Sequence, residues 1–171
     1  MISIYFDNMK KIIIGVMGAG ETAKSEDTKN AFELGKLIAR QDWVLLTGGI
    51  SSGIMDAASR GAKEARGLTV GIIPKLESKI SEAVDIPIIT NMGSARNYIN
   101  VLSSDVVIVC GSLSPGTLSE VALALGADKK VILLGADGET KSFIKKTGGD
   151  KVFAVTTPAE AIELTKKFIE N

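Results

Sequence analysis

Glycine-rich loops at the predicted strand ends are the first residues whose type and spacing could bind a ligand. These loops contain Gly18 and Gly20, Gly48 and Gly49 behind Thr47, Gly93, and Gly111 and Gly116 before Thr117. Glycine lets the backbone approach a phosphate, and a helix that begins after the loop offers free N–H groups and the positive end of its dipole. One such loop is more typical of a tight strand-to-helix turn. Several loops at one edge of a sheet indicate a site for a phosphorylated small molecule.

Two ionisable side chains stand beside these loops. Arg96 follows the loop at Gly93, and its planar guanidinium could hold a phosphate through two parallel hydrogen bonds. Glu120 lies three residues after Thr117, which predicts a capping box in which Glu120 bonds to the start of its own helix. From position alone, a solvated helix arginine and a helix cap are the favoured roles.

Residues 18–23 match the GxGxxA form of the dinucleotide fingerprint. Two features oppose NAD binding. Several charged residues precede the next helical pattern, and the second predicted strand runs into Gly48-Gly49 rather than into an acidic residue that could bind a ribose. We therefore disfavour a bound NAD.

The composition excludes several kinds of chemistry. The sequence has no histidine and one cysteine, Cys110, so it has no internal disulfide, no CxxC motif and no Ser/His or Cys/His nucleophile pair. We predict no metal site, and we expect Cys110 to be a core residue at the end of an apolar strand. Catalysis would depend on carboxylates, arginine, lysine or backbone dipoles.

The charge balance and hydropathy point to a small ligand in the cytoplasm. Twenty basic residues balance twenty acidic ones, so we expect neither a nucleic acid nor a membrane as partner. No apolar run approaches the ~20 residues that span a bilayer, and the N-terminus does not have the pattern of a signal peptide. We expect a cytoplasmic protein.

Strand-like apolar runs alternate with segments of helical spacing. The strands are predicted at residues 12–17, 43–47, 69–73, 86–89, 105–110, 131–134 and 152–155, and the helices near residues 31–38, 54–65, 95–102, 118–125 and after a capping box at 157–160. This alternation predicts an α/β fold, a three-layer, Rossmann-like, doubly wound and mainly parallel sheet of about seven strands with helices on both faces. Residues 1–171 are predicted to form one domain. Residues 1–8 could be an extension, because Met9 is an alternative start.

Short motifs connect these elements to a known superfamily. They lie at residues 14–18, 47–49, 53–57, 71–74, 96–97 and 116–120. In this order and spacing they resemble the group that contains the Lonely Guy cytokinin-activating phosphoribohydrolases, proteins long described as possible lysine decarboxylases, and the molybdenum cofactor carrier proteins. The resemblance runs from about Lys11 to the final helix. It implies self-association as a dimer or larger assembly, such as a tetramer.

The resemblance also assigns roles to residues. In Lonely Guy enzymes a PGGxGTxxE loop binds phosphate, and its Glu acts with an Arg from the preceding helix to cleave a base from ribose 5′-phosphate. This implies phosphate binding at Gly116 and Thr117 and catalytic roles for Glu120 and Arg96. The chain departs from that pattern at residues 110–117, where bulkier residues replace a glycine pair, and at Asn97, where the enzymes have Lys. An Arg-Asn pair followed by GTLSE resembles the cofactor-carrier branch.

Two functional classes remain open. We favour a binding or carrier protein for a phosphorylated small molecule, either a nucleotide or the molybdenum cofactor, because the altered loop should move the phosphate relative to Glu120. The alternative is a hydrolase of nucleoside 5′-monophosphates, in which Arg96 holds the substrate and Glu120 orients water or stabilises positive charge on the ribose. The predicted ligand-binding residues are Gly18, Gly20, Thr47, Gly48, Gly49, Arg96, Asn97, Gly111, Gly116 and Thr117. Lysine decarboxylation is disfavoured, because no lysine lies in a motif suited to a pyridoxal Schiff base.

Overall fold

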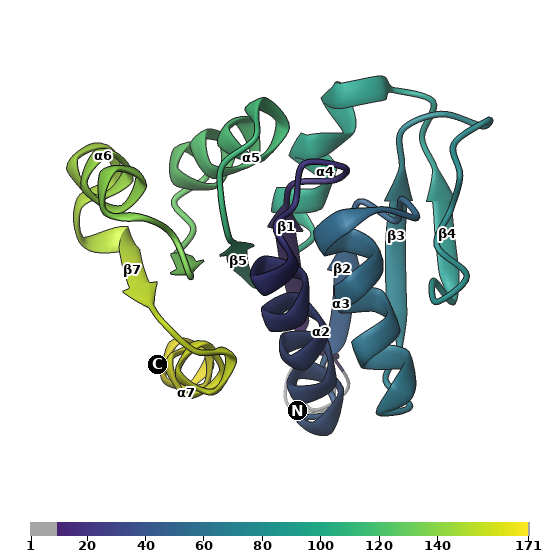
Figure 1. The fold of residues 1–171 in the computed structure, drawn as a ribbon, viewed down its shortest axis with the longest axis horizontal. Coiled ribbons are helices and arrows are strands. Elements are labelled where there is room, and N and C mark those ends of the chain that lie inside the picture. The colour runs from purple at the N-terminus through teal and green to yellow at the C-terminus, as the bar shows by residue number, and fades with distance from the viewer. Residues whose placement is uncertain (1–9, 171) are drawn as a thin grey trace, which may run out of the picture.

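The structure is a computed structural model that describes residues 10–170, so the prediction about residues 1–8 and Met9 lies outside the described residues. Seven parallel strands form one sheet in the order β4-β3-β2-β1-β5-β6-β7 (Figure 1). Their bounds are β1 Ile13–Gly18, β2 Val44–Thr47, β3 Thr69–Ile73, β4 Ile86–Ile89, β5 Val106–Cys110, β6 Val131–Leu134 and β7 Val152–Val155. The predicted doubly wound α/β fold is confirmed.

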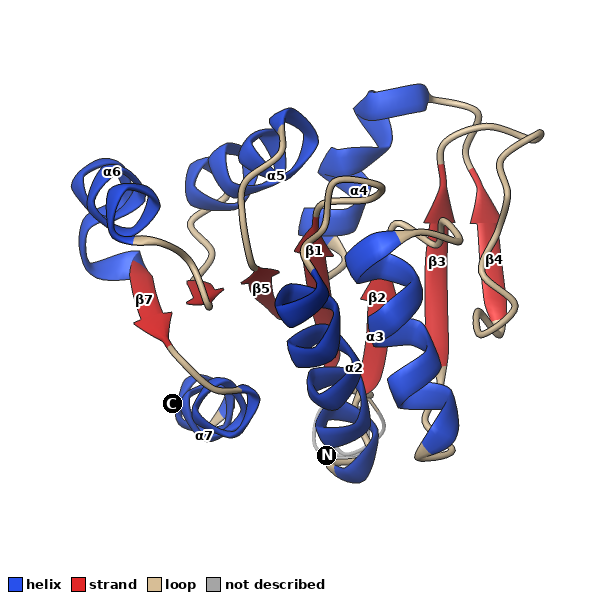
Figure 2. Ribbon diagram, in the orientation of Figure 1, coloured by secondary structure: helices blue, strands red, loops and turns tan. Residues whose placement is uncertain are grey.

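Helices cover both faces of this sheet (Figure 2). The helices are α2 Ser25–Arg40, α3 Gly53–Glu64, α4 Asn97–Leu102, α5 Pro115–Gly126, α6 Gly138–Gly148 and α7 Pro158–Ile169, with short 3-10 turns η1 Gly93–Arg96 and η2 Gly149–Lys151. One core cluster joins the sheet to α2, α3 and α7, and a second joins it to α4, α5 and α6. In β5, Val106 and Ile108 belong to the first cluster and Val107 and Val109 to the second, because side chains alternate along a strand.

The order of the strands places a crevice between β1 and β5. After β1 the chain adds β2, β3 and β4 on one side, and it then returns to add β5, β6 and β7 on the other. The helices that follow β1 and β5 therefore leave in opposite directions, toward opposite faces of the sheet. In open α/β sheets, ligands bind at such a switch point, at the carboxyl ends of the strands.

The small residues of α3 pack against α2. From the sequence alone, this helix could equally contact the sheet or a neighbouring molecule. In the structure, a side chain at Gly61 would collide with the backbone carbonyl of Phe32, and one at Gly35 with that of Ala58. The two helices are therefore in close backbone contact, and the glycines make this contact sterically feasible.

The sequence did not predict one of the helices, and it correctly predicted the cap of another. The helix α6 was not predicted, since Phe143 and Ile144 are its large apolar residues and Phe143 is exposed. Its start is fixed instead by the Asp137 side chain, which accepts a 2.7 Å hydrogen bond from the backbone N–H of Thr140. The capping box of α7 is confirmed, with Thr157 and Glu160 bonded to each other's backbone.

Within residues 10–170, no helix combines the length and the apolar character that crossing a membrane requires.

Candidate functional site

A pocket of about 150 Å³ lies at the carboxyl ends of β1, β2 and β5. The predicted residues that line it are Gly18, Gly20, Gly48, Arg96, Asn97, Gly116, Thr117 and Glu120. Val16 and Met17 of β1 and Met55 of α3 add an apolar wall. Loops far apart in the sequence thus meet at the switch point of the sheet.

Arg96 enters the pocket from the end of η1. Its Nη1 donates a 2.9 Å hydrogen bond to the carbonyl of Ile72, whereas its Nε is buried and has no hydrogen-bond partner. Burial lowers the pKa of Arg96, and the nearby charge of Glu120 acts in the opposite direction. The guanidinium is anchored through one nitrogen, and its remaining hydrogen-bonding capacity suits an anion.

Gly48 makes room for this guanidinium. A Cβ at position 48 would collide with both terminal nitrogens of Arg96 and with the sulfur of Met55. The glycine after β2 therefore determines where Arg96 lies, although it offers no side chain of its own.

The start of α5 forms another part of the pocket wall. Ser114 is the N-cap, and its Oγ accepts a 3.2 Å hydrogen bond from the N–H of Thr117. Pro115 has no N–H, so Gly116 is the first-turn residue whose N–H the cap leaves unused. The positive end of a 12-residue helix therefore lies at the pocket.

Glu120 lies in the second turn of α5, so the predicted capping box with Thr117 is wrong. The helix begins at Pro115, three residues before its predicted start. The side chain of Glu120 is instead buried, and its Oε1 accepts a 2.7 Å hydrogen bond from Nδ2 of Asn100. Burial raises the pKa of Glu120, although the Asn100 hydrogen bond and the charge of Arg96 act to lower it.

Asn97 connects the two helices beside the pocket. Its Nδ2 donates to Oγ of Ser119 at 2.8 Å and to the carbonyl of Gly116 at 3.4 Å. Asn97 therefore holds the start of α5 against α4, and its amide hydrogens already have partners.

Three predicted residues do not line the pocket. The Oγ1 of Thr47 accepts a 3.0 Å hydrogen bond from the N–H of Gly49. Gly49 and Gly111 have φ values of 71° and 77°, in the region that favours glycine, and Gly111 packs closely against Asp27. These residues shape the loops behind the site. Their predicted contact with a ligand stays a prediction.

Sequence reasoning overlooked Ser114, Met55 and Asn100. Ser114 before Pro115 is the usual signal for a helix start. Asn100 stands four residues after Arg96, and this spacing places both on one side of the η1–α4 segment. Its contact with Glu120 depends on how α4 packs on α5.

Cys110 is a buried core residue, as predicted. Its Sγ donates to the carbonyl of Asp27 at 3.3 Å, and burial, together with the charge of Asp27, raises its pKa to about 12. The thiol is therefore protonated near neutral pH and unsuited to act as a nucleophile. Across residues 10–170, no three His, Cys, Asp or Glu side chains gather as a metal site.

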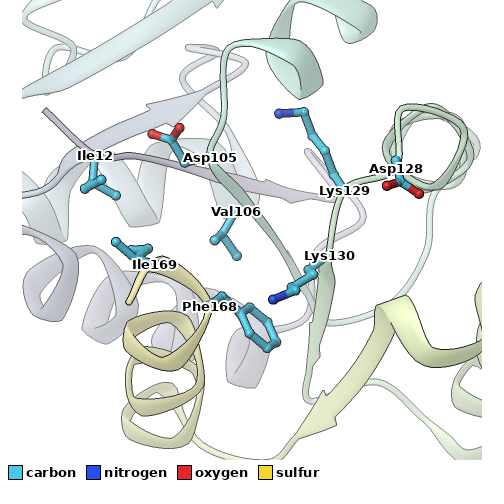
Figure 3. A pocket seen from close by; sticks show the side chains of 8 residues that line it. All are labelled: Ile12, Asp105, Val106, Asp128, Lys129, Lys130, Phe168 and Ile169. Carbon is cyan, nitrogen blue, oxygen red and sulfur yellow. The ribbon is translucent and has the colours of Figure 1, made fainter. Parts of the chain in front are cut away.

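A second and larger pocket, about 360 Å³, lies at the opposite end of the strands (Figure 3). Asp105, just before β5, binds Lys10 at 2.9 Å and accepts a 2.8 Å hydrogen bond from the N–H of Ile13. The Lys130 ammonium lies 4.3 Å from the centre of the Phe168 ring. None of the residues predicted to bind a ligand lines this pocket.

The comparison with protein families agrees with this geometry. The model of the SLOG cluster4 family matches residues 11–162. The chain belongs to this family. The superfamily resemblance derived from the motifs is therefore confirmed.

Several relatives of this SLOG cluster4 protein are similar over most of their length. The molybdenum cofactor binding protein of Rippkaea orientalis is 54% identical, with a TM-score of 0.91 over 94% of this chain and 99% of that one. The molybdenum cofactor carrier protein of Chlamydomonas reinhardtii is 46% identical, with a TM-score of 0.90 over 95% of this chain and 100% of that one. An uncharacterised protein of Archaeoglobus fulgidus is 44% identical over 126 residues, which are 74% of this chain and 82% of that one.

Proposed function

We propose that this chain binds and carries a phosphorylated small molecule, with a ligand of the molybdenum cofactor type. The observation that carries the proposal is Arg96, which lines the pocket together with the start of α5 and whose buried Nε has no hydrogen-bond partner. A buried donor without a partner costs free energy, and an anion would satisfy it. The similarity to a molybdenum cofactor carrier and a molybdenum cofactor binding protein supports this choice of ligand.

The residues present fit the phosphate end of such a cofactor. Arg96 would pair with the phosphate, and the Gly116 N–H and the helix dipole would face it. At about 150 Å³ the pocket is smaller than the roughly 300 Å³ at the lower end for drug-sized ligands, so it accommodates part of the cofactor. The cofactor supplies its own redox chemistry when it is bound, and this chain would bind and shield its phosphate.

Phosphoribohydrolase activity is the second candidate, because Arg96 and Glu120 line the same pocket. In that function Arg96 would hold the substrate phosphate, and Glu120 would orient water or stabilise positive charge on the ribose. Glu120 is hydrogen-bonded to Asn100, and burial disfavours its ionised form. Glu120 is therefore poorly suited to stabilise a positive charge on the ribose. Among the described residues, no lysine lines the pocket that could serve a decarboxylase.

Three further expectations stay predictions. They are the cytoplasmic location, the single domain over residues 1–171, and the homo-oligomer, either a dimer or a tetramer. Light scattering of the purified protein measures the mass in solution, and a monomeric mass at micromolar concentration would contradict the oligomer.

Titration calorimetry with AMP tests the proposed function. Arg96→Ala should weaken binding by about 10- to 100-fold, since a hydrogen bond to a charged group contributes about 1.5–3 kcal/mol. Arg40→Ala, at the far end of α2, is the matched control and should bind as the wild type does. Native mass spectrometry of freshly purified protein should show a retained phosphorylated molecule.

Two outcomes would contradict the carrier proposal. Equal AMP binding by the wild type and Arg96→Ala would show that the pocket does not bind phosphate. Rapid release of adenine from AMP by the wild type, abolished in Glu120→Gln without loss of folding, would establish the hydrolase instead.

A further inference from the structure

The amide of Asn100 has one unused hydrogen-bonding group. Asn100 is fully buried in α4, and its Nδ2 donates to Oε1 of Glu120 at 2.7 Å. Its Oδ1 is buried and has no hydrogen-bond partner. Native proteins rarely leave a buried acceptor unpaired, so this oxygen calls for an explanation.

A protonated Glu120 would provide the missing donor. An ionised carboxylate can only accept hydrogen bonds, whereas a protonated carboxyl also carries one O–H donor. A protonated Glu120 could accept from Nδ2 of Asn100 with one oxygen and donate to Oδ1 with the other. The ionised form leaves Oδ1 unpaired next to a negative charge.

The surroundings of Glu120 hold one opposite charge. Arg96, from η1, is the charged group that acts on Glu120, and Asn100 is its hydrogen-bond partner from α4. The other pocket walls contribute Val16 and Met17 from β1 and Thr117 from α5 itself. An anion bound at Arg96 would neutralise the one charge that favours ionised Glu120 and would add a negative charge beside it. Burial would then be opposed only by the hydrogen bond from Nδ2 of Asn100, which a protonated Glu120 also accepts.

We propose that Asn100 is a positioning residue that holds Glu120 protonated when an anion fills the pocket, so that anion binding takes up one proton. This inference rests on the proposed function, because it places the phosphate beside Arg96. The protonation step is Glu120-COO⁻ plus a solvent proton giving Glu120-COOH, with no other bond made or broken. The ligand class is a doubly charged anion such as a phosphate ester.

The direction of the pH dependence follows from linkage. An anion next to a carboxyl raises the pKa of that carboxyl, so protonation of Glu120 must raise the affinity for the anion by the same factor. Affinity is highest below the pKa of Glu120 in the free protein and falls as pH rises through it. A coupling of about tenfold is in the ordinary range for two linked sites.

Sulfate is the probe, because it keeps both charges between about pH 5 and pH 9, so that changes in affinity report the protein. Titration calorimetry in two buffers of different protonation enthalpy counts the protons taken up. The wild type should lose about tenfold in affinity as the pH rises and should take up protons on binding. Glu120→Gln, which is neutral at every pH, should bind sulfate with no pH dependence over this range and no proton uptake.

Infrared difference spectra test the role of Asn100. Sulfate binding should add the carbonyl stretch of a protonated carboxyl in the wild type, and Glu120→Gln should abolish that band. Asn100→Leu, which removes the amide but keeps the size, should move the band to higher frequency, because the carboxyl loses its hydrogen-bond partners. If Asn100 had only a structural role, the frequency of this band would be the same in Asn100→Leu and the wild type.

The outcomes separate this inference from the proposed function. Sulfate binding that is equally strong at all pH values, without proton uptake, overturns the inference and leaves the anion pocket intact. A band that Asn100→Leu does not shift overturns the role of Asn100. If Asn100→Leu fails to fold, the pH profile of Glu120→Gln still decides the proton coupling. No sulfate binding by the wild type at any pH overturns both proposals.

Discussion

The two ends of the sheet differ in how their polar groups are used. The pocket in Figure 3 is the larger, about 360 Å³ against about 150 Å³, yet each of its charged side chains has a partner. The partners are Lys10 with Asp105, Asp128 with Lys151, Lys129 with the carbonyl of Ser104 at 2.6 Å, and Lys130 with the ring of Phe168. At the other end, Arg96 and Asn100 each have a buried atom without a partner. Unused hydrogen-bonding capacity identifies the candidate site better than volume does.

The polarity of the helices explains the difference. In a parallel sheet with helical crossovers, helix N-termini lie at the carboxyl ends of the strands and helix C-termini at the opposite ends. The C-termini attract cations, and Lys129 bonds to the carbonyl of Ser104, two residues after the end of α4. The N-termini attract anions, and the start of α5 lies at the smaller pocket. Lys129 in Figure 3 is therefore explained as the partner of a helix end, and Lys130 as the partner of the Phe168 ring.

Gly48→Ala should have the largest effect on the difference in anion binding between the two ends of the sheet. The new methyl would collide with the guanidinium of Arg96, and because that group ends a flexible side chain, it should move away rather than unfold the protein. AMP binding should weaken by about 10- to 100-fold, as if the arginine contact were lost. Titration calorimetry measures the affinity, and thermal unfolding measures the stability.

Gly126→Ala is the control for this substitution. Nothing lies within 4 Å of a Cβ at position 126, at the end of α5, so binding should not change. Undiminished AMP binding in Gly48→Ala would show that the position of Arg96 does not determine affinity. The conclusion that the two ends of the sheet differ in anion binding would then lose its main support.

Asp105→Ala should affect stability at the other end of the sheet. The carboxylate accepts a 2.8 Å hydrogen bond from the N–H of Ile13, and its removal leaves that partly buried group without its acceptor. We expect the free energy of unfolding to fall by about 1–3 kcal/mol. Chemical denaturation measures this loss, and AMP binding should stay at the wild-type level. Asp105→Asn keeps an acceptor, so its free energy of unfolding should fall less than that of Asp105→Ala. Weaker AMP binding in Asp105→Ala would indicate that the larger pocket takes part in ligand binding.

The strands of the sheet could be predicted closely from the sequence. The bounds of β3, β4, β6 and β7 match the predictions, because runs of apolar residues between polar segments identify strands of a parallel sheet. Helix α6 was missed because its apolar pattern is short, and its N-cap at Asp137 is a local signal. The loops with Gly18 and Gly20, with Gly48 and with Gly116 were correctly expected to meet at one edge, because topology alone brings them there, whereas Gly93 does not line the pocket.

The side-chain contacts of the site could be predicted only in part. Placing the start of α5 three residues late assigned Glu120 to a helix cap, although Ser114 and Pro115 carried the signal for the earlier start. The bond between Asn100 and Glu120 joins two helices, so it depends on packing that no local pattern encodes. The space that Gly48 leaves for Arg96 also depends on tertiary packing that no local pattern encodes.

Lys130→Met should have the smallest effect, and it tests whether the larger pocket binds anions. The exposed ammonium lies 4.3 Å from the centre of the Phe168 ring, a contact that contributes about 0.5–1 kcal/mol at exposed sites. Methionine is unbranched and only one atom shorter than lysine, and its sulfur also contacts aromatic rings favourably, so the free energy of unfolding should fall by about 0.5 kcal/mol or less. Chemical denaturation measures this change. Sulfate and AMP should bind with wild-type affinity, because the proposed anion site lies at the opposite end of the strands. A loss of binding in Lys130→Met comparable to that of Arg96→Ala would show that the anion binds in the pocket in Figure 3. The larger pocket, and not the one beside Arg96, would then be the candidate site.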